Sequence, residues 1–346
     1  MALDPVPWFI GGAAEHSAEA ARNIAWNATS GRTGVSTTTS LRVTALATAG
    51  GGVRIAPGGA SVESTYAGAT QQSYTVRNDA STTVSVPANT GSSTITRYVI
   101  VEVNDPQYAG SAPSNPVDGP YNFFRVVSSL PTVHPYVRLA TLRIPPSTSV
   151  ITNAMITDDR ALVAPRRAEV VHARPRVSSD GGAGSQSELT AMLPGRGEWF
   201  PGGAGFSNEF TATVPTWATR MIIEPAWLSV RMNGTNSWGR FWMEYGDERN
   251  TSGKWPTSEG VDQEYEFKTQ TFTWDMNETG VVYRTNWMLA DNRVVPARIR
   301  GKELTFVYKA GRLSGPTRPV RLDATSGLTC RITFIEDPQG GHDDAI

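Results

Sequence analysis

Arg-Tyr-Val-Ile-Val-Glu-Val at residues 97–103 is the stretch that decides the fold. Val99, Val101 and Val103 share one face of an extended chain and Ile100 lies on the other, so we expect a central strand covered on both sides. This strand belongs to a run over residues 95–160 that closes on Ile-Thr-Asn-Ala-Met-Ile-Thr-Asp-Asp-Arg. The sequence before the end of this run fits one compact domain, and the sequence after it fits a linker and a second domain.

The composition of the first half favours short strands joined by turns. The chain of 346 residues contains 33 Gly and 23 Pro, and Thr, Ser and Val are frequent in its first half. Turn signals such as Gly-Gly-Gly at 50–52 and Asn-Asp-Pro at 104–106 separate the apolar runs. The strands that we expect lie at 41–48, 53–55, 61–65, 73–77, 82–86, 97–103, 121–128 and 136–144. Residues 1–165 therefore read as a small β-barrel or sandwich domain.

One helix is expected in this first domain, near residues 14–28. Ala14, Ala18, Ala21, Ala25 and Ala28 recur at steps of four and three, which is a helical period. A stripe of alanine buries little area but lets another backbone approach closely. The stripe fits packing on the domain's own sheet and packing against a symmetry mate equally well. Before the helix, residues 1–12 read as an extended arm whose Trp8 and Phe9 are suited to pack against a neighbour.

Charge and cysteine content exclude several classes of protein. Lys and Arg number 31 against 32 Asp and Glu, so no strong field would attract nucleic acid or an anionic membrane. The single cysteine, Cys330, lies at an apolar position of a predicted strand, which predicts a buried small side chain and no intramolecular disulfide. No secretion signal and no membrane-length apolar stretch is found, so we expect a chain made in the cytoplasm with no membrane insertion.

No motif for catalysis, metal binding or cofactor binding occurs. The four histidines are scattered through the sequence, and no HExxH, GxSxG, Walker or dinucleotide-binding pattern is found. We therefore expect no catalytic residue, no metal and no cofactor.

Five phrases carry a resemblance over about the first 165 residues. They are Glu-His-Ser-Ala-Glu-Ala-Ala-Arg at 15–22, Leu-Arg-Val-Thr-Ala-Leu-Ala-Thr at 41–48, Gln-Gln-Ser-Tyr-Thr-Val-Arg-Asn at 71–78, Tyr-Val-Ile-Val-Glu-Val-Asn-Asp-Pro at 98–106 and the closing phrase at 151–160. In this order they resemble the amino-terminal region of minor tail proteins from long-tailed phages of actinobacteria. The resemblance implies a virion protein of the tail tip or baseplate, present in several copies, whose front domain binds other tail proteins. It assigns no catalytic residue.

The second half has a different composition. Residues 166–187 are rich in Arg, Gly and Ser and read as a flexible linker. Residues 188–346 hold eight of the ten tryptophans, and the strands that we expect there lie at 208–214, 220–232, 239–245, 263–275, 280–290, 303–309 and 328–336. This pattern predicts a β-sandwich of the jelly-roll type.

The residues 238–245 form the most informative local pattern of the second domain. In an extended strand, Phe241, Met243 and Tyr245 would face the core, and the other face would alternate aromatic and charged side chains. Aromatic rings that stack on sugars and charged groups that bond hydroxyls are typical of a carbohydrate site. The candidate ligand-binding residues are Trp238, Arg240, Trp242 and Glu244, with Trp274 from a neighbouring strand.

We therefore expect a mainly β, non-catalytic tail-tip protein, a homotrimer on the combined grounds of the helix and the resemblance, whose second domain binds a host cell-wall glycan. Two alternatives stay open. In one, both domains are structural and the tryptophans fill cores and subunit interfaces. In the other, carboxylates of the second domain hydrolyse wall polysaccharide; the candidates are Glu244, Asp247, Glu248, Asp262 and Glu264.

Overall fold

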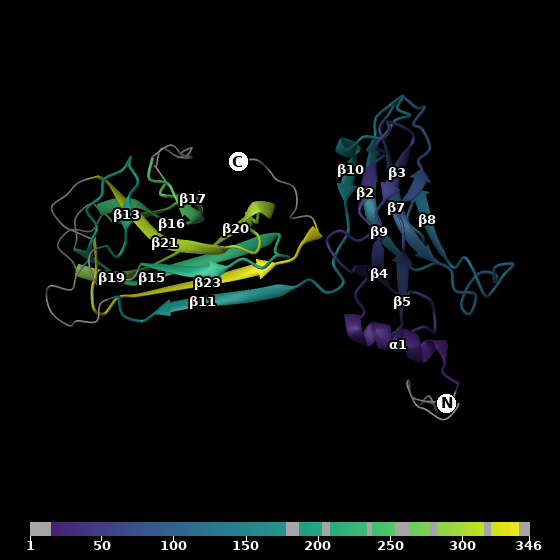
Figure 1. Cartoon of the computed structure of the whole chain (residues 1–346), viewed down its shortest axis with the longest axis horizontal. Coiled ribbons are helices and arrows are strands. Elements are labelled where there is room, and N and C mark those ends of the chain that lie inside the picture. Colours follow the sequence, from purple (N-terminus) through teal and green to yellow (C-terminus); the bar gives the residue numbers. More distant parts are fainter. Residues whose placement is uncertain are drawn as a thin grey trace. The chain divides into compact units, whose positions relative to one another are not determined.

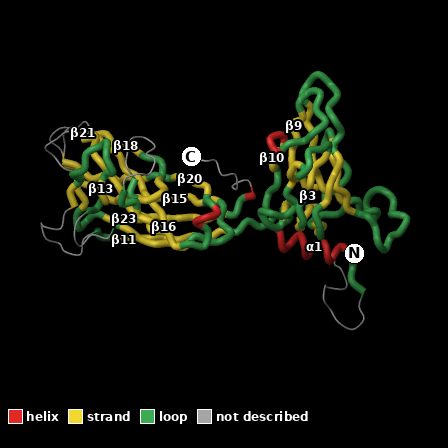
Figure 2. Tube along the Cα trace, turned by 45° about the horizontal axis from the view of Figure 1, so that its top comes forward, coloured by secondary structure: helices red, strands yellow, loops and turns green. Residues whose placement is uncertain are grey.

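The computed structural model describes residues 15–177, 187–202, 208–233, 237–252, 263–276, 282–314 and 320–338. The chain divides between Pro165 and Arg166 into two compact units. Both are built mainly from antiparallel strands, as Figures 1 and 2 show, which confirms the mainly β fold class.

Unit 1 contains three small sheets, with strand orders β1-β4-β5, β10-β9-β7-β8 and β2-β3-β6. The strands are β1 Gly34–Val35, β2 Val43–Ala45, β3 Gly52–Ile55, β4 Gly58–Glu63, β5 Ser73–Asn78, β6 Thr82–Ser85, β7 Ile95–Val103, β8 Asn122–Val127, β9 Tyr136–Ile144 and β10 Ile156–Asp158. A short 3-10 helix, η1 (Asn153–Met155), precedes β10.

The core of unit 1 forms where these sheets meet. β7 lies between β9 and β8, and its residues 99–103 are all buried, so the prediction of a central strand is confirmed. Val99 and Val101 contribute to the main core together with Leu139 and Leu142 of β9. Because both faces of β7 are covered, its continuous apolar run is explained by burial rather than by a helical period.

The helix of unit 1, α1 (Ala18–Thr29), begins after an N-cap at Ser17, whose hydroxyl accepts a hydrogen bond of 3.0 Å from the Ala20 N–H. It ends where Ser30 adopts the left-handed conformation and Gly31 continues it with φ 69°. None of its side chains is fully buried. In Figure 1 the helix lies across the ends of β4 and β5, so it covers one end of the unit.

Unit 2 is built from two larger sheets. One contains β11, β23, β15, β22 and β12, with β19 and β20 also paired to β15; the other contains β13, β14, β21, β16, β17 and β18. The strands are β11 Arg167–Arg174, β12 Ser187–Glu188, β13 Glu198–Trp199, β14 Glu209–Thr213, β15 Arg220–Asn233, β16 Ser237–Arg249, β17 Tyr265–Lys268, β18 Phe272–Met276, β19 Val282–Met288, β20 Asp291–Val294, β21 Glu303–Ser314, β22 Val320–Leu322 and β23 Gly327–Ile335. A 3-10 helix, η3 (Ala297–Ile299), precedes β21.

One large core lies between the two sheets of unit 2. Trp227 of β15 packs edge-on against Phe241 of β16 and Tyr308 of β21, so aromatic rings join the two layers. Cys330 of β23 is completely buried in this core. Burial raises the pKa of the Cys330 thiol, which keeps it protonated.

The structure corrects two sequence-based boundaries. Residues 167–174, assigned above to a flexible linker, form β11 and pair along their whole length with β23. Their alternation of exposed and half-buried residues is the pattern of an edge strand, which the high arginine content obscured. Residues 178–186 of the predicted linker lie outside the described residues. The single strand expected over 263–275 is two strands, β17 and β18, separated at 269–271.

Candidate functional site

The predicted ligand-binding face of β16 is largely buried. Trp242 and Glu244 have no exposed surface, whereas Trp238 and Arg240 are half-buried. The alternation along the strand does separate two faces as expected, because Phe241, Met243 and Tyr245 belong to the core between the sheets. The second face is therefore not the open aromatic surface that the alternation suggested.

The cover over Trp242 is the chain between β12 and β13. Leu193 of this segment packs on Trp242 together with Leu313 of β21, which makes a small second core outside the sandwich. Gly197, with φ 61°, lies so close that a Cβ atom there would stand 2.5 Å from the Trp242 ring. Only glycine permits this approach, because it combines a left-handed backbone with the absence of a side chain. The segment thus seals the middle of the predicted site.

Trp274 lies on the opposite face of the sheet from Trp242. On β16 it pairs with Gly239, which lies on the strand face that is directed into the sandwich. Trp274 is 5% exposed and stacks on Trp287 at 4.4 Å between ring centroids. The structure therefore does not bring Trp274 together with Trp238 and Trp242, and the predicted five-residue set does not form one surface.

A polar network that is only partly buried begins at Trp242 and Glu244. Glu244 accepts hydrogen bonds from the Trp242 indole at 2.9 Å and from the backbone N–H groups of Glu264 and Tyr265 at 2.8 and 3.2 Å. The Lys309 ammonium, 2% exposed, lies 3.4 Å from Glu264. Arg249 and the Trp199 indole also donate to Glu264, and Arg249 stacks over the Trp199 ring at 4.7 Å. Two carboxylates and two cations thus form one network, which is buried at Glu244 and Lys309 and reaches solvent at Arg249.

The two carboxylates of this network shift in opposite directions. Burial raises the pKa of Glu244 against the opposing effects of Lys309 and the N–H donors. Burial would also raise the pKa of Glu264, but Trp199, Lys309 and Arg249 outweigh it and lower that pKa. Opposed shifts in a carboxylate pair are a feature of glycosidase sites. In this structure Glu244 has no exposed surface and both its oxygens accept N–H groups of the protein, and the contacts of the pair join β16, β17 and β21.

Unit 1 contains a second polar cluster, which sequence reasoning missed, at the place where α1 meets the sheet. Arg22 donates to Gln72 at 2.5 Å and to Gln107 at 2.7 Å, and its guanidinium lies 3.2 Å from Asp105. It also lies over the ring of Tyr74, 5.4 Å from the centroid. One side chain therefore links the helix to β5 and to the loop after β7. We refer to Arg22, Gln72, Tyr74, Asp105 and Tyr108 as the Arg22 anchor.

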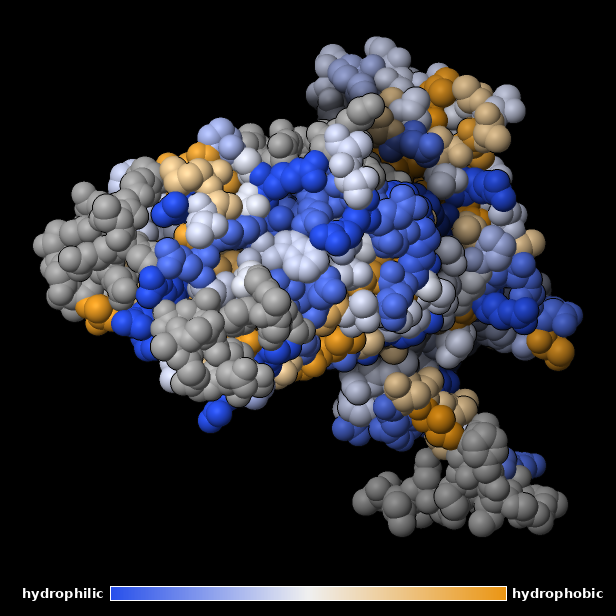
Figure 3. Space-filling view, turned by 60° about the vertical axis from the view of Figure 1, so that its left-hand side comes forward, coloured by the Kyte–Doolittle hydropathy of each residue, from blue (hydrophilic) through white to orange (hydrophobic). Residues whose placement is uncertain are grey.

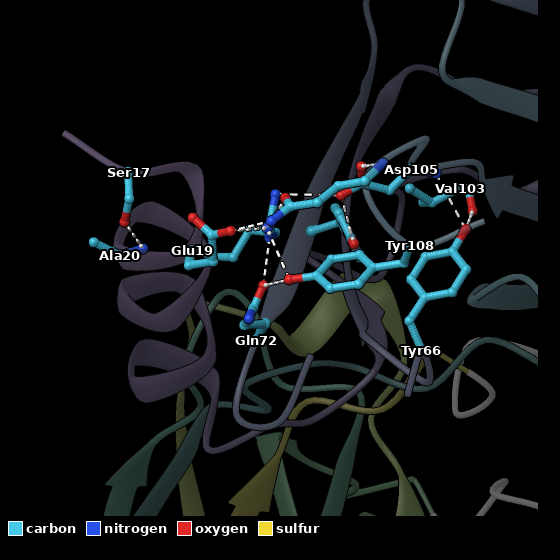
Figure 4. Close-up of polar contacts among 11 residues, drawn as sticks. Ser17, Glu19, Ala20, Tyr66, Gln72, Val103, Asp105 and Tyr108 are labelled. Carbon is cyan, nitrogen blue, oxygen red and sulfur yellow. Dashed lines mark hydrogen bonds and ion pairs between the residues drawn. The ribbon is translucent and has the colours of Figure 1, made fainter. Parts of the chain in front are cut away.

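Tyrosines extend the Arg22 anchor toward β7, as the close-up in Figure 4 shows. Tyr108 is stacked on Tyr66 with 5.5 Å between ring centroids, and its hydroxyl donates to Gln72. The Tyr66 hydroxyl donates to the Val103 carbonyl at 2.9 Å and receives the Asp105 N–H at 3.1 Å. Burial raises the pKa of Tyr66, so this hydroxyl keeps its proton at neutral pH. The cluster therefore joins α1 to β5 and to the chain on either side of the end of β7.

No local pattern in the sequence predicts the Arg22 anchor, because its members come from three separate segments. The signal that was available is the set of resembling phrases. Arg22 ends the phrase at 15–22, Gln72 and Tyr74 lie in the phrase at 71–78, and Asp105 lies in the phrase at 98–106. Three phrases far apart in sequence meet at one point of the structure.

Beside the Arg22 anchor, an open groove of about 480 Å³ lies between α1 and the neighbouring strands. Its helix side carries the alanine stripe, and its other walls come from β5, the end of β7 and the start of β8. The residues that line it are Ala18, Ala21, Arg22, Ala25, Ser73, Tyr74, Thr75, Val103, Asn104, Asp105, Tyr121 and Asn122. The alanine stripe therefore faces a hollow rather than a filled core.

Among the described residues, no group of three or more His, Cys, Asp and Glu side chains is arranged to hold a metal ion. Within the same part of the chain, no helix has the length and apolar character needed to cross a membrane. On the face drawn in Figure 3, hydrophilic residues predominate and apolar residues occur in separate patches.

Comparisons with known proteins give only distant similarities. No protein-family profile matches the sequence, and no curated protein matches it. Among solved structures, infectious bursal disease virus, Gx strain, is similar at 10% identity over 88% of this chain and 71% of that chain, with a TM-score of 0.25. The VP2 subviral particle of infectious bursal disease virus gives 11% identity over 90% and 69% of the two chains and a TM-score of 0.24. Rhinovirus-B5 gives 12% identity over 51% and 80%, with a TM-score of 0.19.

Proposed function

We propose that this chain is a non-catalytic structural protein of a virion, located at the tail tip or baseplate. In this proposal unit 1 attaches the protein to other tail proteins, and several copies assemble together. Unit 2 is the tip domain of the assembled protein in this proposal.

The observation that carries the proposal is the convergence of the resembling phrases on the Arg22 anchor. Phrases scattered over residues 15–106 supply Arg22, Gln72, Tyr74 and Asp105, which contact one another directly. Residues from three of the five phrases thus pack on one another in unit 1. Their contacts hold α1 on the domain. This supports an architecture shared with the amino-terminal region of the tail proteins that the phrases resemble.

The last phrase, at 151–160, is built into unit 1 in the same way. Arg160 is 1% exposed and donates to the Ser40 carbonyl at 2.6 Å and to both oxygens of Asp158. An arginine that is buried and bonded this fully fixes the end of the domain on the chain around Ser40. The buried arginine of this phrase therefore has a structural role within unit 1.

For unit 2, the burial of Trp242 and Trp274 supports a scaffold role over an aromatic binding surface. Tryptophan side chains that fill cores add apolar contact area and rigidity to the domain. Glu244 and Lys309 are likewise buried, and their burial supports a structural role over a catalytic one.

The test of the proposal is the location of the chain in purified particles of the virus that encodes it. Antibodies raised against the full chain should label the end of the tail in immunogold electron microscopy, and the chain should be found in the particles by mass spectrometry. A chain that is absent from particles, or that labels the head, would overturn the proposal.

A second candidate function is adhesion to a host cell-wall glycan, which we propose only for the open end of the predicted face. Trp238 and Arg240 retain exposed surface there. If this site binds glycan, full chain carrying Trp238→Ala should bind actinobacterial cells several-fold more weakly than the unmodified chain. Val171→Ala, an exposed change on β11, is the matched control. An assembled chain that binds no strain would contradict adhesion and leave the scaffold role.

A further inference from the structure

Two arginines share the outer face of the β10-β9-β7-β8 sheet. Val99 and Val101 of β7 face the core of unit 1, so Ile100 between them faces outward. Ile100 pairs with Arg125 of β8 on one side and with Arg138 of β9 on the other. The backbones of the two arginines are therefore two strand spacings apart, which is about 10 Å.

Arg125 is held by two neighbouring side chains. Its Nε donates a hydrogen bond of 2.9 Å to Glu102, and its guanidinium lies over the Phe123 ring, 4.9 Å from the centroid. The Glu102 side chain is 8% exposed, whereas the Arg125 side chain is 44% exposed. The carboxylate is therefore covered, and the arginine reaches solvent.

Arg138 repeats this arrangement on the other side of β7. Its Nε lies 3.4 Å from Asp159, and its guanidinium lies over the Tyr98 ring, 6.0 Å from the centroid. Asp159 is again the more buried partner, with a side chain that is 15% exposed against 43% for Arg138. Within the described part of the chain, the Nη groups of Arg125 and Arg138 make no hydrogen bond or ion pair. Both guanidiniums are thus oriented by their Nε atoms and by a ring, and both keep their outer N–H groups for a ligand.

We propose that this face binds a partner protein that presents two carboxylate side chains, one to Arg125 and one to Arg138. The planar guanidinium matches a carboxylate with two parallel N–H···O bonds. A guanidinium that is already oriented loses less rotamer freedom on binding than one on a free side chain. The buried positions of Glu102 and Asp159 leave the positive groups as the ones that a partner meets.

A protein fits this face better than a glycan or a nucleic acid does. A guanidinium already lies over each of the Phe123 and Tyr98 rings, so these rings are not open for stacking on a sugar. Each arginine has its own carboxylate, so the pair supplies no excess charge, whereas nucleic-acid binding depends on many cations that neutralise phosphates. Arginine, tyrosine and phenylalanine are enriched at protein interfaces.

The arginine pair gives a partner chemistry to the attachment role proposed for unit 1, and in this respect it rests on that proposed function. The two can fail separately. A chain that does not bind carboxylates would remove the arginine site and leave the location in the particle unaffected. A chain that is absent from particles would remove the tail role and leave the binding unaffected.

Poly-L-glutamate is the probe for this site, because it carries carboxylates on a peptide backbone. Binding to the full-length chain is measured by calorimetry at about 0.15 M salt, where charges further apart than about 8 Å are screened. We expect Arg125→Lys and Arg138→Lys each to weaken binding by about tenfold or more, since lysine keeps the charge but cannot form the paired bonds. Arg143→Lys, an exposed change on the same strand as Arg138, is the matched control and should bind as the unmodified chain does.

Three results would overturn the proposal. The first is an unmodified chain that does not bind poly-L-glutamate. The second is unchanged binding in both lysine variants, which would mean that charge alone attracts the probe. The third is binding to hyaluronate or to duplex DNA that is as tight as binding to poly-L-glutamate, which would point to a glycan or a nucleic acid in place of a protein.

Nuclear magnetic resonance of the unmodified chain gives a second measurement that does not depend on how the variants fold. The Nε–H signals of Arg125 and Arg138 should shift when poly-L-glutamate is added, and the signal of Arg143 should not. Shifts of equal size at all three arginines would refute a specific site.

Discussion

The Trp242 indole donates a hydrogen bond of 2.9 Å to Glu244, two residues further along β16, and both side chains are completely buried. Residues two apart on a strand face the same side, so the outer face of this sheet is buried at both positions. The chain between β12 and β13 lies across β16 and buries this face.

Removal of the Trp242 ring should destabilise unit 2 strongly. Trp242→Ala leaves a cavity under Leu193 and deprives Glu244 of a donor, so we expect the free energy of unfolding in urea to fall by about 3–5 kcal/mol. Trp238→Ala, on the same face but half-buried, should cost less than half as much. Equal losses for the two variants would show that the cover over Trp242 does not form.

A side chain at Gly197 should displace the cover. Gly197→Ala adds a left-handed backbone penalty and a contact of 2.5 Å with the Trp242 ring. Gly68→Ala has the same backbone problem, with φ 84°, but no heavy atom within 4 Å. We expect the control to cost about 1 kcal/mol and Gly197→Ala to cost more, by about 1–3 kcal/mol, in chemical denaturation. Similar costs would argue against the close approach.

Acid should weaken unit 2 through Asp323, which lies 2.6 Å from Arg284. Burial would raise the pKa of Asp323, but Arg284 and the Thr325 N–H and hydroxyl lower it to about 2. Since this folded-state pKa lies below the unfolded value, the stabilisation is complete above about pH 4 and is lost as the pH falls toward 2.

The difference in unfolding free energy between wild type and Asp323→Asn measures this contribution. We expect it to be about 2 kcal/mol near pH 6 and to shrink below pH 4. Asp79→Asn, which removes an ion pair exposed on both sides, is the control and should leave stability within about 0.5 kcal/mol of wild type. A pH-independent difference for Asp323→Asn would contradict the lowered pKa.

The attachment of α1 to the rest of unit 1 should depend on the planar guanidinium of Arg22. Arg22→Lys keeps the charge but cannot bond Gln72, Gln107 and Asp105 at once, so the amides of α1 should exchange hydrogen at least tenfold faster. Arg77→Lys, whose side chain is 81% exposed, should leave exchange in α1 unchanged. Unchanged exchange in Arg22→Lys would mean that apolar packing alone holds the helix.

Several features of the fold could be predicted from the sequence because they depend on a local pattern of residues. The valine alternation in β7 predicted a strand covered on both sides, and the burial of residues 99–103 confirms it. The alanine period predicted a helix, observed as α1 (Ala18–Thr29). In β11 the same kind of reasoning failed, since arginines at both ends made an edge strand look like a linker.

The sequence by itself determined the mainly β class and the two faces of β16, because side chains alternate along any extended strand. Only the tertiary structure decided which of those faces meets water. Trp242 is buried by Leu193 and Gly197, more than 40 residues earlier in the chain, and Trp274 is turned inward by its register with Gly239. The Arg22 anchor and its groove likewise form only where segments that are far apart in sequence come into contact. The periodicity of residues along one strand or helix does not predict such long-range contacts.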